Sequence, residues 1–600
     1  MNTYKKLPPW YLLVPVLLIA IGVLLPLFYL LIRAFGASTE TLYEVVLRVR
    51  NLRLLGNTLL LTASVLVVDT LLALPLAYLS ARCNIAARKF ITLLGVVPLA
   101  MPGYVMAYAF MGLGGYNGTL YEWFGILVAR PSGFFGSLLV LSICTFPYLY
   151  LNLRTALLGM DPSIEEASRS LGNDAKSTFL KVIIPQLKPA FLAGFLLVSL
   201  HVFGDFGTVS LMRFETFSYA LYLQYVAAYD RIYAAWLALM LLALTTAALV
   251  LEYRLLKKAI FYRLGRGASR ERKYLELGTW KISAYTFVGL YMVGAIFLPL
   301  SSIGFWLNEA ALSQLYGDLL SSFWNSVIAS APAALLTTLM ALPIAYMGVR
   351  FKGKFTNILE RVAYLGYATP PLAFALAFVF FSLYVSPFLY QTLLLLIIAY
   401  SLHFLAEGIG PIRSSLYQAP PQLEDAAKSL GYSSFKSFIK VTLPLLKGGI
   451  IASASLVFLS AMKELSITFL LSPIGFNTLA LNVWSYTGEA MFAEAAPFSF
   501  AILIFSTLFV GLLFSREWNK HRSAVQIKNL SKAFDDSGPV VDSLSFDVKE
   551  NEIFALLGPS GCGKTTCLRL ISGFERADKG EVYVRRTPFG VARAPRSTPG

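Results

Sequence analysis

Long apolar runs alternate with short polar segments along most of the chain. The first run, "LLVPVLLIAIGVLLPLFYLLI" from Leu12 to Ile32, is as long as the roughly 20 residues that a helix needs to cross about 30 Å of hydrocarbon. The same test predicts twelve membrane spans, near residues 11–33, 57–80, 91–113, 134–152, 190–212, 234–256, 282–306, 325–348, 361–384, 390–410, 449–471 and 496–514. Up to residue 518, therefore, the sequence predicts an all-α polytopic membrane protein.

Composition agrees with this prediction. Hydrophobic residues make up 57% of the chain, the mean hydropathy is +0.66, and only 14% of the residues are charged, against roughly 25% in an average soluble protein. The four cysteines are scattered and the chain has three histidines, so neither a disulfide framework nor a metal site is predicted.

The basic residues indicate how the chain is oriented. They fall in short loops between apolar runs, and the formal charge of +17 therefore indicates loop orientation in the bilayer and no nucleic-acid partner. The linker from Arg254 to Lys281 contains nine basic residues, whereas three loops contain no lysine or arginine: 307–323, 385–389 and 472–495. The positive-inside rule predicts that this linker and both termini are cytoplasmic.

Segment 34–56 breaks that rule. It should be external, yet it contains Arg48, Arg50 and Arg53. An amphipathic helix along the membrane interface, with its arginines reaching toward water, is the expectation.

Two stretches occur twice. "NTLLLTASVLVVDTLLALPLAY" at 57–78 returns as "NSVIASAPAALLTTLMALPIAY" at 325–346, an offset of 268 residues. "EEASRSLGNDAKSTFLKVIIPQLKPA" at 165–190 returns as "EDAAKSLGYSSFKSFIKVTLPLLKGG" at 424–449, an offset of 259. Because each half has six predicted spans, the chain is predicted to be one duplicated domain with parallel repeats facing each other across a pathway.

The second repeated stretch places an acidic residue six positions before a glycine and a proline thirteen after it. These residues are Glu166, Gly172 and Pro185 in the first copy, and Asp425, Gly431 and Pro444 in the second. A short helix that ends at a glycine, followed by an amphipathic stretch, is suited to present a rigid knob outside the membrane.

Three charged residues fall inside predicted spans: Asp205, Lys463 and Glu464, of which Asp205 and Glu464 are repeat partners. A charge at such depth costs about 2.5 to 3.5 kcal/mol. The carboxylates either line a pathway or its outer gate, or lock helices together, for instance through Lys463. Although carboxylates suit a ferric ion, no metal site is predicted.

After Trp518 the pattern changes to that of β-hairpins, and the strand "EIFALL" leads into "GPSGCGKT", which fits GxxxxGK[ST]. The glycines let backbone N–H groups face phosphate, Lys564 can reach the β and γ oxygens, and Thr565 can hold Mg²⁺. The predicted phosphate-binding residues are Gly558, Ser560, Gly561, Cys562, Gly563, Lys564, Thr565 and Thr566.

The duplicated loops resemble the EAA coupling loop of ABC transporter permeases of the binding-protein-dependent, type I importer kind. In that family the loop helix docks into a groove of the ATP-binding subunit. The matching residues are Glu166, Ala167, Gly172 and Pro185, with Ser168 in place of the second alanine, and Asp425, Ala426, Ala427, Gly431 and Pro444, with Asp in place of Glu.

Two further stretches narrow the resemblance. "FGDFGTVSLM" at 203–212 and "MKELSITFLLSPIGFNTLALNVW" at 462–484 resemble the fused two-domain permeases of iron(III) uptake, which are adjacent to thiamine and phosphonate permeases. Over residues 10–518 the resemblance implies two tandem six-helix domains in a bacterial inner membrane. It also implies two ABC ATPase subunits and an external substrate-binding protein as partners.

The last part resembles the opening of an ABC ATPase, in which Phe534 of "LSKAF" stands where that family stacks an aromatic on adenine. The family's Q-loop, signature, Walker B and switch-histidine segments are not found. The fold expected here is a truncated α/β P-loop fragment, and hydrolysis of ATP with Mg²⁺ is expected from separate subunits.

These observations predict four parts: permease domains at 1–275 and 276–518, a partial ATP-binding domain at 519–584, and an irregular tail at 585–600 that looks out of frame or truncated. The predicted function is an iron(III) importer permease, with thiamine, phosphonate, polyamine or another small solute as alternative substrates. A twelve-span ion-coupled secondary transporter and a self-energised transporter–ATPase fusion are the rival hypotheses.

Overall fold

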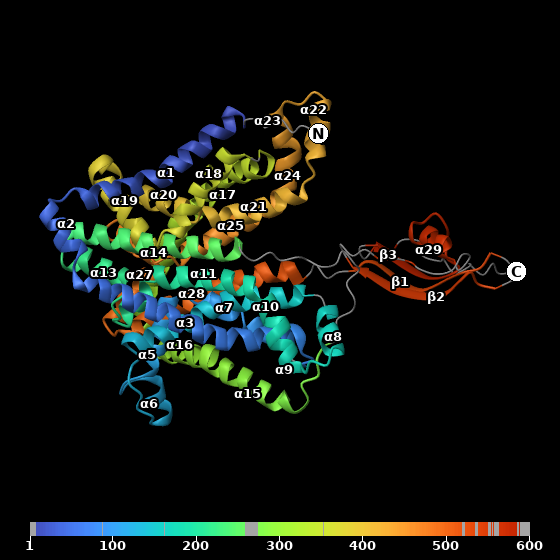
Figure 1. Ribbon diagram of the computed structural model, residues 1–600, viewed down its shortest axis with the longest axis horizontal. Helices are drawn as coiled ribbons and strands as arrows, with labels where there is room; N and C mark the ends of the chain where they lie inside the picture. Colours follow the sequence, from blue (N-terminus) through green and yellow to red (C-terminus); the bar gives the residue numbers. More distant parts are fainter. Residues whose placement is uncertain are drawn as a thin grey trace. The chain divides into compact units, whose positions relative to one another are not determined.

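The computed structural model describes residues 8–86, 88–160, 162–257, 274–351, 353–518, 523–534, 538–549, 554, 556, 563–584 and 587–588. It divides into two compact units, Met1–Thr507 and Leu508–Gly600 (Figure 1). The first unit is a bundle of helices that contains both sequence repeats.

The helices of the first half are α1 Trp10–Phe35, α2 Thr39–Val46, α3 Val49–Arg82, α4 Arg88–Leu94, α5 Gly103–Leu113, α6 Thr119–Phe124, α7 Gly133–Gly159, α8 Pro162–Ser170, α9 Ala175–Thr178, α10 Ile184–Gln186, α11 Lys188–Gly204, α12 Gly207–Leu211, α13 Phe217–Tyr222 and α14 Arg231–Lys257. Those of the second half are α15 Lys281–Met292, α16 Leu298–Glu309, α17 Leu312–Arg350, α18 Lys354–Ala368, α19 Pro371–Val385, α20 Leu393–His403, α21 Leu405–Gln418, α22 Pro421–Ser429, α23 Ser434–Ser437, α24 Leu443–Leu445, α25 Lys447–Met462, α26 Ser466–Leu471, α27 Leu479–Gly488 and α28 Phe492–Trp518.

The described residues contain seven helices that are long and apolar enough to cross a membrane, and twelve such segments if each of five bent helix pairs is one span. The twelve segments follow the order of the twelve predicted spans. Two of the bends lie at matching repeat positions: α4 and α5 meet at 96° before Gly103, and α18 and α19 meet at 103° before Pro371. Proline has no N–H for the helical ladder and disfavours helical geometry in the residue before it, and hydropathy averaged over a window does not register such breaks.

The first span of each half packs against the other half. Helix α1 lies against α18 and α19, and α16 lies against α5. The Trp306 indole donates to the Gly112 carbonyl at 3.0 Å, and the Tyr291 hydroxyl donates to the Leu94 carbonyl at 3.1 Å. The two halves therefore exchange their first spans.

Segment 34–56 is helical, as expected, in α2 and the start of α3. Two of its arginines have partners within the protein: Arg50 forms an ion pair with Glu215 at 3.4 Å, and the Arg48 guanidinium lies 4.4 Å from the centre of the Tyr233 ring. Both side chains thus have protein partners while they stay exposed or partly exposed, and the place of this segment at the membrane interface stays a prediction.

The second unit contains an antiparallel sheet in the order β2-β1-β3-β4. Its elements are β1 Ser523–Lys532, β2 Val541–Lys549, α29 Lys564–Ile571, β3 Lys579–Val584 and β4 Thr587–Pro588. The predicted hairpin pattern is confirmed in β1 and β2. Thr587 and Pro588 were expected to be irregular, yet Pro588 pairs with Tyr583, at a sheet edge where proline is tolerated.

Candidate functional site

A cavity of about 370 Å³ lies between the two halves, where bent spans from each half meet. The bends that follow Pro102 and Pro370 both line it. Its ionisable lining includes His201, Asp205, His403, Glu407, Lys463 and Glu464. A polar cavity inside a bundle of apolar spans is suited to admit a hydrated or charged solute.

Asp205 and Glu464 line this cavity and also cap short helices. Asp205 accepts hydrogen bonds from the N–H groups of Thr208 at 3.0 Å and Val209 at 3.1 Å, in the first turn of α12. Glu464 accepts from the N–H of Ile467 at 3.1 Å, in the first turn of α26. Capping satisfies N–H groups that the helix itself leaves without partners. The repeat partners therefore have the same local role in both halves.

Lys463 connects the halves in another way. Its ammonium donates to the carbonyl of Leu99 at 3.2 Å, and its own carbonyl accepts from the Tyr104 hydroxyl at 3.1 Å. Lys463 thus joins the two halves through backbone carbonyl and hydroxyl groups, and whether Asp205 and Glu464 line the pathway or only lock helices together stays open.

Glu407 is a cavity residue that the sequence interpretation missed. Its Oε1 accepts from the Ser460 hydroxyl at 2.8 Å. An acidic residue near the end of the predicted span 390–410 was the available signal. Its repeat counterpart, 259 residues earlier, is Tyr148, so a search for paired charges did not find it.

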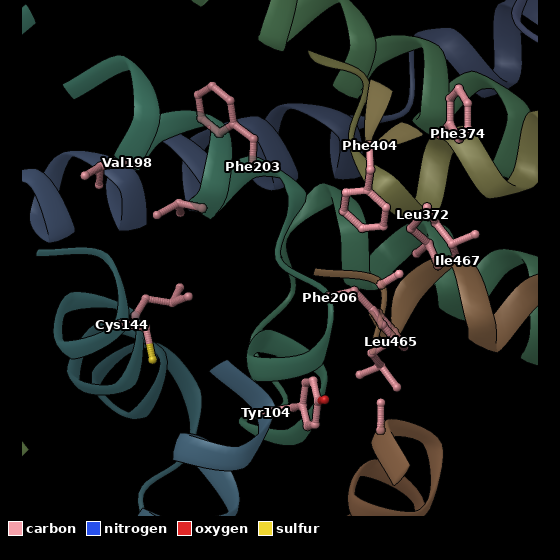
Figure 2. Close-up of a cluster of buried hydrophobic side chains, with 14 of the residues drawn as sticks. Tyr104, Cys144, Val198, Phe203, Phe206, Leu372, Phe374, Phe404, Leu465 and Ile467 are labelled. Atoms are coloured by element: carbon pink, nitrogen blue, oxygen red, sulfur yellow. The ribbon is translucent and has the colours of Figure 1, made fainter. Parts of the chain in front are cut away.

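Aromatic side chains from both halves pack together on one side of the cavity. This aromatic cluster consists of Phe206, Tyr222, Phe469 and Trp484, with ring centres 5.1 to 5.9 Å apart. The Trp484 indole also donates to the Ser210 hydroxyl at 2.9 Å. Figure 2 shows Phe206 of the first half and Leu465 of the second pointing into the same region. The cluster therefore joins the residues before α12 and the end of α13 in the first half to α26 and α27 in the second.

The two candidate coupling loops have the same structure. Helices α8 and α22 each end before a glycine in the left-handed region, Gly172 with φ +85° and Gly431 with φ +89°. A short helix and a π-helical turn follow, Phe179–Ile183 and Phe438–Thr442, and then come α10 with Pro185 and α24 with Pro444. Figure 1 shows α8 and α22 at the end of the bundle opposite α13 and α27.

The predicted loop residues divide between two faces of the loop helix. Four lie on the exposed face: Glu166, Ala167, Asp425 and Ala426. Ser168 and Ala427 are buried, and the neighbouring Leu171 and Leu430 are 84% and 80% exposed. Each loop therefore presents an exposed leucine near an exposed carboxylate.

The acidic residue one position earlier was missed in both loops. Glu165 pairs with Arg82, and Glu424 pairs with Arg350 at 3.2 Å, with all four side chains at most 13% exposed. The motif contains two adjacent acidic residues, and their order in the sequence does not reveal which one is buried.

In the second unit, four predicted phosphate-binding residues lie outside the described residues: Gly558, Ser560, Gly561 and Cys562. Gly563, with φ +85°, precedes α29, and Lys564, Thr565 and Thr566 form its first turn. Phe534 is 55% exposed, with the Lys532 ammonium 5.3 Å from its ring centre. The Ala533 N–H and the Lys532 ammonium hold the pKa of Asp578 below its usual value.

The described part of the chain contains no group of three or more His, Cys, Asp or Glu side chains placed to hold a metal ion.

Comparisons with known proteins agree with this geometry. The chain is similar to the Fe(3+)-transport system permease protein FbpB 2 of Haemophilus influenzae, with 32% identity over 511 residues that cover 84% of this chain and 98% of that relative. It is also similar to the ferric transport system permease protein FbpB of Actinobacillus pleuropneumoniae, with 27% identity over 493 residues that cover 76% and 71%.

The last part has other relatives. It is 57% identical over 60 residues to the spermidine/putrescine import ATP-binding protein PotA of Thermotoga maritima, covering 10% of this chain and 16% of that relative. Residues 541–597 match the ABC transporter family.

Residues 73–261 and 338–522 each match the family described as binding-protein-dependent transport system inner membrane component. These two matches take up more than half of the 600 residues. The chain therefore belongs to this family of ABC importer permeases.

Proposed function

We propose that this chain forms the membrane pathway of an ATP-driven importer of iron(III). The observation that supports this most is the likeness to a relative named as an Fe(3+)-transport permease, which the alignment covers over 98% of that relative's length. Iron(III) is a hard cation that prefers oxygen ligands, and Asp205, Glu407 and Glu464 bring carboxylates to one cavity. Lys463 in the same cavity keeps binding weak, which suits passage of the ion.

The partners and their places follow from the same proposal. Two ABC ATPase subunits dock on the exposed faces around Leu171 and Leu430, and an external substrate-binding protein delivers the ion. Residues 1–275 and 276–518 are the two permease domains, in a bacterial inner membrane, with the linker and both termini in the cytoplasm. The aromatic cluster then closes the pathway on its external side.

The nucleotide site has a supporting role. Gly563 and the N-terminus of α29 present backbone N–H groups in the manner that suits phosphate. Lys564, Thr565 and Thr566, with Gly558, Ser560, Gly561 and Cys562, would hold ATP and Mg²⁺, and Phe534 would stack on adenine. Hydrolysis is assigned to the two separate ATPase subunits.

The test combines uptake and ATP turnover. Cells that produce the chain with its ATPase and binding protein are expected to accumulate radioactive iron(III). Lys564→Ala is expected to leave the uptake rate within about twofold, because the variant loses only the phosphate contact of this chain, while the separate ATPase subunits that are assigned the hydrolysis keep theirs. Loss of uptake in Lys564→Ala, together with ATP turnover by the purified chain alone, would favour the self-energised fusion. Uptake that persists without the ATPase subunits but stops when the ion gradient collapses would favour a secondary transporter.

Polyamine import is a second candidate, supported by the likeness of 60 residues in the last part of the chain to PotA. Carboxylates also attract cationic amines, so the cavity alone does not separate the two. Competition distinguishes them: excess spermidine should leave iron(III) uptake unchanged if iron is the substrate.

A further inference from the structure

The second span of each half is attached to its coupling loop. Arg82, the last residue of α3, pairs with Glu165 of α8, and Arg350, the last residue of α17, pairs with Glu424 of α22. The arginines are 268 residues apart and the glutamates 259, the same offsets as the two repeated stretches. The attachment was therefore duplicated with the domain and is not incidental to one copy.

Further hydrogen bonds join Glu424 to its surroundings. Its Oε2 accepts from the Tyr346 hydroxyl at 2.7 Å, and its Oε1 accepts from the Thr442 hydroxyl at 2.9 Å. Arg350 also donates to the Ala419 carbonyl at 2.9 Å. One buried carboxylate thus joins α17, α22 and the π-helical turn.

An aromatic pair beside the coupling loop is present in both copies. The Tyr78 and Phe179 rings meet edge to face at 5.4 Å, and their counterparts Tyr346 and Phe438 meet at 5.0 Å. Buried charge pairs and packed rings hold the loop helix and the span end as one body.

The part of each long helix that is far from the coupling loop is attached to another helix: α3 to the start of α13, and α17 to the start of α27. In the first half, the Asn57 amide donates to the Glu215 carbonyl at 2.9 Å, and Thr58 Oγ1 accepts from the Phe217 N–H at 3.2 Å. Phe217 begins α13, and its N–H is one that the helix leaves unpaired.

The second half has the same arrangement. The Asn325 amide donates to the Asn477 carbonyl at 2.9 Å, and Ser326 Oγ accepts from the Leu479 N–H at 3.0 Å, where Leu479 begins α27. Asn325 and Ser326 are the repeat counterparts of Asn57 and Thr58. Each long helix therefore has one fixed contact near the coupling loop and one at α13 or α27.

The helix between these contacts is long and continuous. From Asn57 to Arg82 it rises roughly 38 Å at about 1.5 Å per residue. Pro75 in α3, and Pro332 and Pro343 in α17, each remove one backbone donor, but both helices continue through them. Helices α13 and α27 come soon after α12 and α26, whose first turns line the cavity.

We propose that Glu165 and Glu424, through their arginines, are positioning residues that make α3 and α17 rigid links from the coupling loops to α13 and α27. When an ATPase subunit displaces a loop, the rigid helix then moves α13 or α27 on the far side of the cavity, whether or not a solute is bound. The exposed Glu166 and Asp425 have a different role, on the docking face. The statement that ATPase subunits displace the loops rests on the proposed function. The mechanical link between each loop and α13 or α27 does not depend on it.

Amide hydrogen exchange on the full chain in lipid nanodiscs tests the link without any partner or substrate. Glu424→Gln should speed exchange of the Leu479 amide at least about threefold and leave the Phe217 amide unchanged, because each link lies within one half. Glu165→Gln should do the reverse. Glu360→Gln is the matched control, since Glu360 pairs with Arg413 and neither belongs to α22 or α27.

Unchanged exchange of Leu479 in Glu424→Gln, or equal effects on both amides, would overturn the proposal. If Glu424→Gln does not fold, Tyr346→Phe takes its place, because it removes one hydrogen bond to the same carboxylate. Faster exchange of the Leu479 amide alone would then support the proposal, and unchanged exchange would overturn it.

Transport measured with the assembled complex tests the consequence. Glu424→Gln should lower iron(III) uptake per ATP hydrolysed by about tenfold while ATPase binding stays normal, because the docking face around Leu430 is unchanged. Uptake per ATP at the wild-type level would contradict the proposal. If the wild-type complex moves no iron(III), the proposed substrate is wrong, and the exchange result still decides the link.

Discussion

A carboxylate beside a membrane cavity can serve the helix that it caps, the solute that passes, or both. Asp205 and Glu464 cap α12 and α26 and also line the cavity. A substitution that keeps the cap and removes the charge separates these roles, because asparagine caps about as well as aspartate, whereas alanine loses about 1 kcal/mol.

The prediction at this scale therefore concerns Asp205→Asn. It should keep the thermal stability of the protein and lower iron(III) uptake at least about tenfold if the charge attracts the ion. Asp205→Ala should lower both. Uptake and thermal unfolding of the purified variants provide the measurement. Normal uptake by an Asp205→Asn protein of reduced stability would assign the residue to helix packing alone.

At the scale of the element, the coupling loops depend on a backbone conformation that few residues adopt. Gly172 and Gly431 both have positive φ and open space where a Cβ would lie. Any cost of substitution thus comes from the backbone, roughly 1 to 2 kcal/mol per site for a residue with a side chain.

Alanine at both glycines should therefore distort the loops while the spans stay folded. The expected result is at least about fivefold weaker retention of the ATPase subunits on affinity purification, since 1 kcal/mol corresponds to roughly that factor. Gly410→Ala is the control, because Gly410 lies in α21 and also has open space around it. Equal retention in all three proteins would show that the loops do not need the left-handed turn.

The sequence predicted where the helix of each coupling loop ends, but not which acidic residue of the loop is buried. Glycine and proline spacing predicted a helix that ends at Gly172 or Gly431, and duplication identified it as a functional element. Which of two adjacent acidic residues faces inward depends on Arg82 and Arg350, which are distant in sequence. Such contacts are set by tertiary packing, and local pattern does not contain them.

For the whole molecule, periodicity and repeats predicted twelve spans in two halves, because a spanning helix needs a minimum apolar length whatever its neighbours are. They did not predict the bends at the cavity or the exchange of first spans. Both depend on how helices pack, and helix packing in lipid depends on close side-chain fit more than on hydrophobicity.

The exchanged first spans predict how the molecule behaves when it is divided. Helix α1 packs on α18 and α19, the Tyr29 and Tyr384 rings stack at 6.0 Å, and the Arg33 guanidinium lies 5.3 Å from the centre of the Tyr384 ring. Fragments 1–265 and 266–600 produced together should therefore associate without a covalent link and restore iron(III) uptake to at least about a third of the intact level. Removing residues 1–36 from the first fragment should weaken association and leave the second fragment more sensitive to proteolysis, because its apolar face on α18 and α19 then lacks its partner. Co-purification of the fragments and their proteolysis half-lives give the measurement. Equal recovery with and without α1 would mean that the remaining contacts between the halves, among them those of α16 with α5 and those of Lys463, are sufficient.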